Sequence, residues 1–313
     1  VIARSTWGGS SSSSSRCWDG QIELEIRAQV VVMAAGALWT PVLLRRSGLR
    51  NKHIGKNLHI HPVLSSWGYF PDAPSHVKPY EGGIMTSFSA HAANWATSGY
   101  GALLMVPSLH PGGFAAFMPW RGAMDSKQTM LRFSKTAHII ALTRDTTSGA
   151  VTEDREGRLS IDYNMSDVDR LHCLGAACNA LRVLAASGAS LIGTPNVDGA
   201  AQLDISSPSA NPPTQLEDFL VYVRSSSLRN SNSPLGSAHQ MGTCRMGVSP
   251  STSVVDPTGE TWEVKGLFIA DTSVFPSATG VNPMVTAQSI AYCTSKSILR
   301  FLVNKTHDRP RQS

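Results

Sequence analysis

The sequence has few charged residues and lacks any long hydrophobic run. Charged side chains make up 16% of its 313 residues and hydrophobic ones 42%, a balance that excludes a chain disordered throughout. No apolar run reaches the ~18 residues of a membrane-spanning helix, and the first residues lack the basic-then-apolar order of a signal peptide. Any membrane anchor is therefore expected to lie outside this chain.

Paired cysteines and clustered positive charge are also missing. The five cysteines form no Cys-x-x-Cys pair, so we expect reduced thiols and no metal site at Cys17, Cys173, Cys178, Cys244 and Cys293. The formal net charge is +5, but the basic residues are scattered and lack the aromatic-interleaved stripe of a nucleic-acid-binding surface. Nucleic acid is therefore not an expected partner.

A glycine-rich dinucleotide motif is absent too. No Gly-x-Gly-x-x-Gly follows an N-terminal strand, and no acidic residue stands at the ribose-reading distance beyond one. The chain starts at Val1 without an initiator methionine, so we expect a fragment or a processed product. Residues 8–15 are two glycines and six serines, and residues 1–20 are expected to be a disordered or low-complexity start.

Both ends of the chain have the pattern of an α/β fold. The apolar block of residues 30–35 predicts a buried strand, and Gly36 separates it from a short helix over residues 37–47. Residues 266–271 predict a second buried strand that ends in Asp271. A further helix is expected from Pro283, with Asn282 as its cap. The two ends are thus predicted to share one domain.

The middle of the chain has a different pattern. Short apolar segments between proline and glycine predict a mainly antiparallel sheet, with one clear helix capped by Ser166 and running almost to Gly188. We therefore expect residues 21–62 to be part of a first domain and residues 63–230 to form an inserted one. Residues 231–303 complete the first domain, and residues 304–313 form a tail.

One histidine suggests acid-base catalysis. His239 lies in the glycine-punctuated segment 237–247, and a histidine with a near-neutral pKa in a rigid turn suits removal of a hydroxyl proton. The alternative is a hydrogen-bonded structural histidine. Asn282 begins a helix whose N-terminus would stabilise the negative charge of a reduced flavin. Asp271 would accept hydrogen bonds from cofactor hydroxyl groups or cap a local turn.

Several motifs in order resemble the glucose-methanol-choline (GMC) family of flavin oxidoreductases. Residues 34–62, including Gly55-Lys56-Asn57-Leu58-His59-Ile60-His61-Pro62, are similar to the family's second signature, and residues 239–247 and 280–284 are similar to its active-site motifs. Other segments resemble the long-chain fatty alcohol oxidase branch: residues 67–71, 80–84, 114–116, 134–138 and 237–242. The resemblance covers nearly all of the chain after residue 21.

The resemblance implies an FAD-dependent alcohol oxidase. His239 would take the proton of the alcohol as hydride passes to flavin N5, and Asn282 would orient the alcohol oxygen. The cofactor-binding residues would be Gly36, Ala37, Asp271, Gly280, Val281, Pro283 and Met284. The implied fold is α/β: a Rossmann-like FAD-binding domain, incomplete at its N-terminus, with an antiparallel-sheet substrate domain inserted.

The implied substrates are a long-chain fatty alcohol and O2, with an aldehyde and H2O2 as products. Membrane association is implied by the branch, through a segment outside this chain. Two alternatives remain: another member of the family, acting on a sugar, sterol, choline-like or aryl alcohol, and an inactive truncated fragment that lacks the Gly-x-Gly-x-x-Gly motif. An aromatic and methionine cluster would form an apolar tunnel or part of the core: Phe114, Phe117, Met118 and Trp120.

Overall fold

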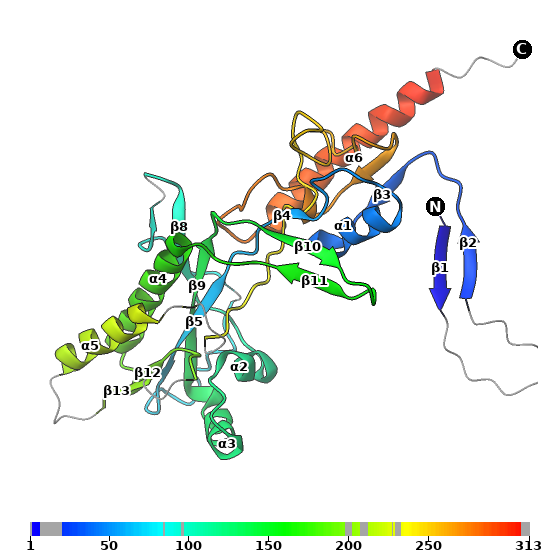
Figure 1. Ribbon diagram of the computed structural model, residues 1–313. Helices are drawn as coiled ribbons and strands as arrows, with labels where there is room; N and C mark the ends of the chain where they lie inside the picture. The colour runs from blue at the N-terminus through cyan, green and yellow to red at the C-terminus, as the bar shows by residue number, and fades with distance from the viewer. Residues whose placement is uncertain are drawn as a thin grey trace, which may run out of the picture.

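The structure is a computed structural model that describes residues 2–6, 21–83, 85–94, 97–197, 202–206, 212–226, 228 and 233–307. The glycine- and serine-rich tract of residues 8–15 lies outside the described residues. Figure 1 shows a large sheet with its helices, connected through a smaller sheet to a layer that contains both α1 and α6.

The layer that joins the two ends of the chain is built on a pair of parallel strands. β3 (Val31–Met33) pairs with β14 (Leu267–Ile269), and helices α1 (Gly36–Arg46) and α6 (Met284–His307) flank them (Figure 1). β14 is buried, as predicted, whereas the Val32 side chain of β3 is 47% exposed. The prediction of a fully buried β3 is wrong because, among the described residues, β14 is the strand that pairs with it.

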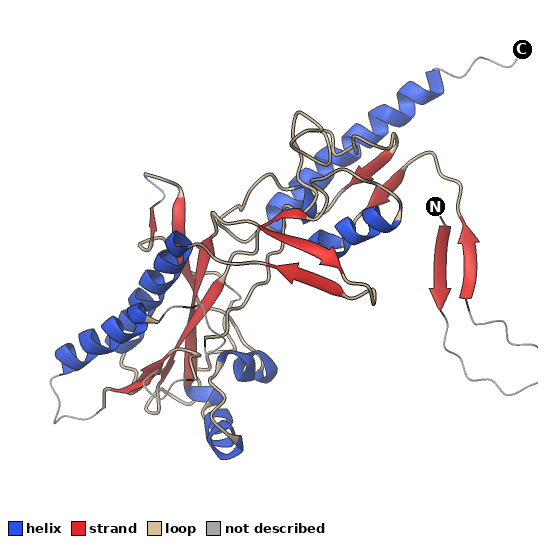
Figure 2. Ribbon diagram, in the orientation of Figure 1, coloured by secondary structure: helices blue, strands red, loops and turns tan. Residues whose placement is uncertain are grey.

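The middle of the chain forms the predicted antiparallel sheet. Its strands run in the order β13, β12, β5, β9, β8, β6, with β7 paired to β8 as well. The arrangement confirms the fold class, α/β with an antiparallel sheet, as Figure 2 shows. The strands are β5 (Val63–Tyr69), β6 (Phe88–Ser89), β7 (Ala93–Asn94), β8 (Tyr100–Met105), β9 (Thr136–Arg144), β12 (Leu191–Gly193) and β13 (Gln202–Asp204).

Helix α4 (Asp167–Ala186) covers one face of this sheet, and α5 (Pro212–Ser225) packs against α4 (Figure 1). The predicted cap is confirmed, because Ser166 Oγ accepts a hydrogen bond from the Asp169 N–H at 3.1 Å. Cys173 and Cys178 are buried in the core between α4 and the sheet, and the described cysteines form no disulfide. Shorter helices follow β8: α2 (Pro111–Phe117), α3 (Ala123–Leu131) and the 3-10 turn Phe133–Lys135.

A three-stranded sheet links the two parts. β10 (Gly149–Glu153) pairs with β11 (Leu159–Asp162) and with β4 (Lys56–Leu58), so it ties the segment after α1 to the segment after β9. An ion pair between Arg46 of α1 and Glu153 of β10 adds a surface contact. Residues 59–62 therefore lie between two paired strands, because β4 pairs with β10 and β5 pairs with β9.

Three details differ from the sequence-based expectation. Residues Ile2–Thr6 form strand β1, paired with β2 (Gln21–Glu25), although the sequence predicts a low-complexity start there. Helix α6 begins at Met284, one residue later than predicted, and the Pro283 carbonyl accepts its first hydrogen bond from the Ala287 N–H. The same helix continues to His307, so residues 304–307 are helical and not a tail.

A substitution at Gly242 tests how closely the turn after His239 packs against residue 57. The φ of Gly242 is +88°, and a Cβ there would lie 2.4 Å from the Asn57 carbonyl oxygen. We expect Gly242→Ala to lower the free energy of unfolding by about 3 kcal/mol, from a left-handed backbone plus a steric clash. Denaturant unfolding measures this.

Gly188→Ala is the matched control, because its φ is +91° and a Cβ added there would have no atom within 4 Å. Its cost should be about 1 kcal/mol, from the backbone alone. Equal losses in the two variants would contradict the close packing of Gly242 on Asn57.

Candidate active site

His239 lies at the edge of a cavity between the two ends of the chain. The cavity has a volume of about 290 Å³, at the small end of ligand pockets. Its walls bring together four predicted site residues from three separate segments: Gly36, Ala37, His239 and Pro283. Gly36 and Pro283, which are 247 positions apart in sequence, therefore meet here.

The turn that carries His239 is tied to residues 57–61 and to α1. Met241 and His59 exchange two backbone hydrogen bonds of 2.9 Å, and Ser237 Oγ donates to the Ile60 carbonyl. Thr243 Oγ1 donates to the Ala37 carbonyl at 2.6 Å. The half-buried His239 ring is thus carried by a segment whose backbone is fixed at both of its ends.

His61 is a site residue that sequence reasoning missed. Its Nδ1 lies 3.1 Å from Nδ1 of His239, and its Nε2 accepts a 2.9 Å hydrogen bond from the Gly280 N–H. One buried ring therefore joins two segments that the sequence suggests only separately. His61 stands out in the sequence only as part of a family-like motif, and nothing in the local pattern distinguishes it from neighbouring His59. What distinguishes His61 is its contacts with His239 and Gly280, which are distant in sequence.

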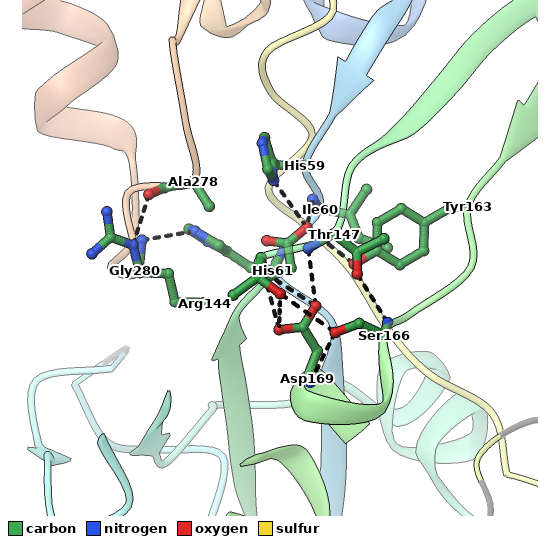
Figure 3. A network of polar contacts seen from close by, with 12 residues as sticks. His59, Ile60, His61, Arg144, Thr147, Tyr163, Ser166, Asp169, Ala278 and Gly280 are labelled. Carbon is green, nitrogen blue, oxygen red and sulfur yellow. Dashed lines mark hydrogen bonds and ion pairs between the residues drawn. The ribbon is translucent and has the colours of Figure 1, made fainter. Parts of the chain in front are cut away.

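The backbone of His61 is held in an unusual conformation. Its φ is +46°, in the left-handed region that residues other than glycine seldom adopt. The buried Asp145 carboxylate accepts hydrogen bonds from the N–H groups of Ile60 and His61, at 3.0 and 3.2 Å, and from the Tyr163 hydroxyl at 3.0 Å. His59, Ile60 and Tyr163 converge beside His61 in Figure 3. These bonds offset the backbone strain.

Burial sets the charge of both histidines. Desolvation lowers the pKa of His61 to about 4, with smaller opposing and supporting effects from Asp145, His239, His59 and Arg144. Burial also lowers the pKa of the His239 ring below its ordinary value. Both rings are therefore neutral at pH 7. A neutral imidazole has one nitrogen without a hydrogen, which is the atom that accepts a proton in acid-base chemistry.

Asp271 shapes the turn before α1. Its Oδ2 accepts hydrogen bonds from the Gly36 N–H at 2.9 Å and from Thr40 Oγ1 at 2.5 Å, and its Oδ1 accepts one from the Ser273 N–H at 2.8 Å. The local-turn role is therefore present. The carboxylate also fixes Gly36, whose φ is +79°, at the start of α1.

The start of α1 suits an anionic or electron-rich group. Ala35 at its cap has no side-chain hydrogen bond to the helix, and the first turn contains no acidic residue. The Gly36 N–H already donates to Asp271, so the attraction for negative charge comes from the N–H groups that follow it in this turn. Gly36 and Ala37 line the cavity beside His239, so the residues present fit a flavin ring there.

The second motif contacts the sheet domain. Asn282 is exposed, and its Nδ2 lies 3.5 Å from Sδ of Met85 in a weak hydrogen bond. Val281 and Met284 are exposed, whereas Gly280 and Pro283 are buried. The loop before them is held by Arg144, whose Nε donates to the Ala278 carbonyl at 3.0 Å (Figure 3). The site residues of this motif are thus presented from a fixed loop.

The proposed apolar tunnel of the middle domain is not a single cavity. Phe114 is buried, packs edge-on against Phe133 and His138, and lines one small cavity. Met118 lines another, and Trp120 is 67% exposed. Phe114 therefore belongs to the core. Within the described residues, no helix combines the length and hydrophobicity needed to cross a bilayer.

The fold is similar to that of two solved oxidase structures. A pyridoxine 4-oxidase from Mesorbium loti is 20% identical with a TM-score of 0.58, and the match covers 89% of this chain and 52% of that one. A formate oxidase from Aspergillus oryzae, described for its FAD modification, is 16% identical with a TM-score of 0.57, covering 90% and 55%. At these identities the likeness establishes the fold.

The sequence comparisons go further. Residues 14–63 and 145–291 match the amino- and carboxyl-terminal models of the GMC oxidoreductase family. The long-chain-alcohol oxidase FAO4A of Arabidopsis thaliana is 45% identical over 285 residues, which are 90% of this chain and 38% of that protein. The chain belongs to the GMC oxidoreductase family, as its motifs indicated. It spans about two fifths of the length of this relative.

The buried histidines predict a pH-dependent stability. Burial lowers the pKa of His61 to about 4 and that of His138 to about 3. The unfolded chain binds protons below about pH 6.5 while the folded chain does not, so stability falls as the pH drops. From pH 7 to pH 5 each ring should cost about 2 kcal/mol, measured by denaturant unfolding at both pH values.

His138→Asn separates the two contributions. Asparagine can keep the 2.9 Å hydrogen bond that His138 Nδ1 makes with Ser65 Oγ, but it does not titrate. The loss between pH 7 and pH 5 should fall by about 2 kcal/mol in this variant. A pH dependence equal to that of the unsubstituted chain would contradict the burial of a neutral His138.

Proposed function

We propose that this chain is the catalytic and substrate-binding portion of an FAD-dependent oxidase of long-chain primary alcohols. One observation carries the proposal: His239, neutral and half-buried, shares a cavity with Gly36, Ala37 and Pro283 at the start of α1. The 45% identity to a long-chain-alcohol oxidase supports the substrate class.

The residues that would hold FAD lie around this cavity. Gly36 and Ala37 lie at the start of α1, the Asp271 carboxylate accepts the Gly36 N–H, and Pro283 lines the same cavity. Gly280, Val281 and Met284 complete the proposed set beside Pro283. Bound FAD would accept a hydride from the alcohol carbon and pass the electrons to O2, which gives H2O2.

His239 and Asn282 have separate roles in this proposal. The primary alcohol loses a hydride from carbon and a proton from oxygen, and the aldehyde is the product. His239 takes the hydroxyl proton, because a neutral imidazole accepts it near pH 7. The amide of Asn282 donates to the alcohol oxygen and orients it. The exposed position of Asn282 leaves the amide accessible to a substrate.

An apolar side chain beside Asn282, that of Met85, supports a long-chain substrate. Met85, which contacts Asn282, packs against a buried cluster on the face of the sheet opposite α4: Val63, Leu103, Met105, Ile140 and Leu142. The cluster itself is buried, so Met85 is the side chain that an alkyl chain would contact. Each CH2 group buried there would contribute about 0.8 kcal/mol. A sugar would not make use of such a surface.

His239→Ala tests the proton acceptor. We expect the rate of peroxide release from a long-chain primary alcohol by the FAD-supplied protein to fall about 100-fold or more. His53→Ala is the matched control, because that ring bonds the Ser251 carbonyl at the surface, and it should retain the rate. Equal rates for the two variants would reject the role of His239. Peroxide release from a sugar alone would reject the long-chain substrate.

Asn282→Ala tests the orienting amide. Loss of one hydrogen bond to the alcohol oxygen should lower kcat/KM about tenfold, with little change in stability because the side chain is exposed. Asn282→His restores a donor and should recover most of the loss. Steady-state rates with a long-chain alcohol measure both variants. An Asn282→His variant as slow as Asn282→Ala would mean that the donor has no role.

A further inference from the structure

Both ring nitrogens of His61 are engaged, and the two contacts determine which nitrogen carries the hydrogen. The Gly280 N–H lies 2.9 Å from Nε2, and a backbone N–H can only donate. Nε2 of His61 must therefore be the nitrogen with the free lone pair. The ring is fully buried and neutral at pH 7, so its single N–H is at Nδ1.

The contact between His61 and His239 then determines the tautomer of His239. Nδ1 of His61 and Nδ1 of His239 are 3.1 Å apart, a distance that holds one hydrogen between them. His61 supplies that hydrogen, so Nδ1 of His239 is the acceptor. A neutral imidazole has only one N–H, and in His239 it must then be at Nε2.

We propose that His61 is a positioning residue that fixes the tautomer of His239, with the Gly280 N–H fixing the tautomer of His61. The tautomer follows from the two contacts, and only its effect on alcohol oxidation rests on the proposed function. In the arrangement seen here, the ring nitrogen of His239 that remains for a substrate carries a hydrogen and donates. His239 in this state orients an oxygen but does not take its proton.

Proton acceptance by His239 requires the opposite tautomer of the pair. In that state Nδ1 of His239 donates to Nδ1 of His61, and the hydrogen of His61 is at Nε2. The pair holds two ring hydrogens in both states, so no net proton is gained or lost. Two N–H groups cannot face each other, so Gly280 must turn away from His61. The loop that carries Val281 and Asn282 thereby controls whether His239 donates or accepts.

The surroundings of His61 keep its ring in one orientation. A half-turn of the ring would replace both nitrogens by carbons and break the contacts to Gly280 and His239 together. The left-handed backbone is fixed by the two hydrogen bonds to Asp145. The Nε2 side of the His61 ring is fixed through Gly280. Arg144 donates to the Ala278 carbonyl, two residues before Gly280, and so holds the loop that carries the Gly280 N–H.

The tautomer is measured directly by long-range 1H–15N correlation spectra of the full chain labelled with 15N-histidine. The His239 signals are assigned by their loss in His239→Gln. We expect the Nε2–H form of His239 to exceed the Nδ1–H form about tenfold or more at pH 7, the ratio for one retained hydrogen bond. A predominant Nδ1–H form in the unsubstituted chain overturns the proposal.

Two variants of His61 each remove one contact. Asparagine places its amide where Nδ1 is and tolerates a left-handed φ, but it does not reach the Gly280 N–H. Either the oxygen or the NH2 group of that amide can then face His239, so His61→Asn should lose the tenfold preference. Glutamine reaches the position of Nε2, so His61→Gln keeps the acceptor for Gly280 and loses the donor to His239. The two forms of His239 should then approach equal populations.

An unchanged preference in folded His61→Gln, checked by circular dichroism, overturns the role of His61. If that variant does not fold, the unsubstituted chain still decides, because a predominant Nδ1–H form there rejects the proposal. An unchanged preference in folded His61→Asn rejects the role of the Gly280 N–H. Failure of the proposed function is a separate result. It would appear as absent peroxide release while the tautomer of His239 is as expected.

Discussion

The buried carboxylate of Asp145 is the interaction on which the arrangement of the site depends. It lies at the end of β9 and accepts hydrogen bonds from the Ile60 and His61 N–H groups and from Tyr163. A buried carboxylate is stable only when its lone pairs are used, so these donors and the charge hold each other in place. Burial and Asp145 together raise the pKa of the Tyr163 hydroxyl, which keeps this donor protonated.

The contacts extend from this carboxylate to both candidate active-site motifs. Asp145 belongs to the antiparallel sheet domain, whereas His239 and Gly280 belong to the segments that close the α/β layer. His61 lies between them and contacts both. The candidate site is therefore built from residues of more than one sheet and the loops between them. A change in the sheet domain near Asp145 would reach His239 through two hydrogen bonds, and the flavin side of the cavity would not need to move.

The sequence was sufficient for the local elements and for the family, but not for the contacts between distant segments. The Ser166 cap, the buried strand before Asp271 and the antiparallel middle follow from short-range patterns, and the structure contains all three. His61 was missed because its role comes from residues 178 and 219 positions away. The exposure of Val32 was missed because an apolar block does not show how many strands will flank it.

The turn at Gly36 has a consequence for the order of folding. Its hydrogen bond to Asp271 closes a loop of 235 residues, whereas most pairings of the antiparallel sheet join strands much nearer in sequence. Long loops are entropically costly to close and form late. During synthesis the strands of the antiparallel sheet are available first, and the cavity is completed only when the segment with Asp271 and Pro283 has emerged. The same order in reverse means that a partial opening of the chain exposes the cavity before the sheet unfolds.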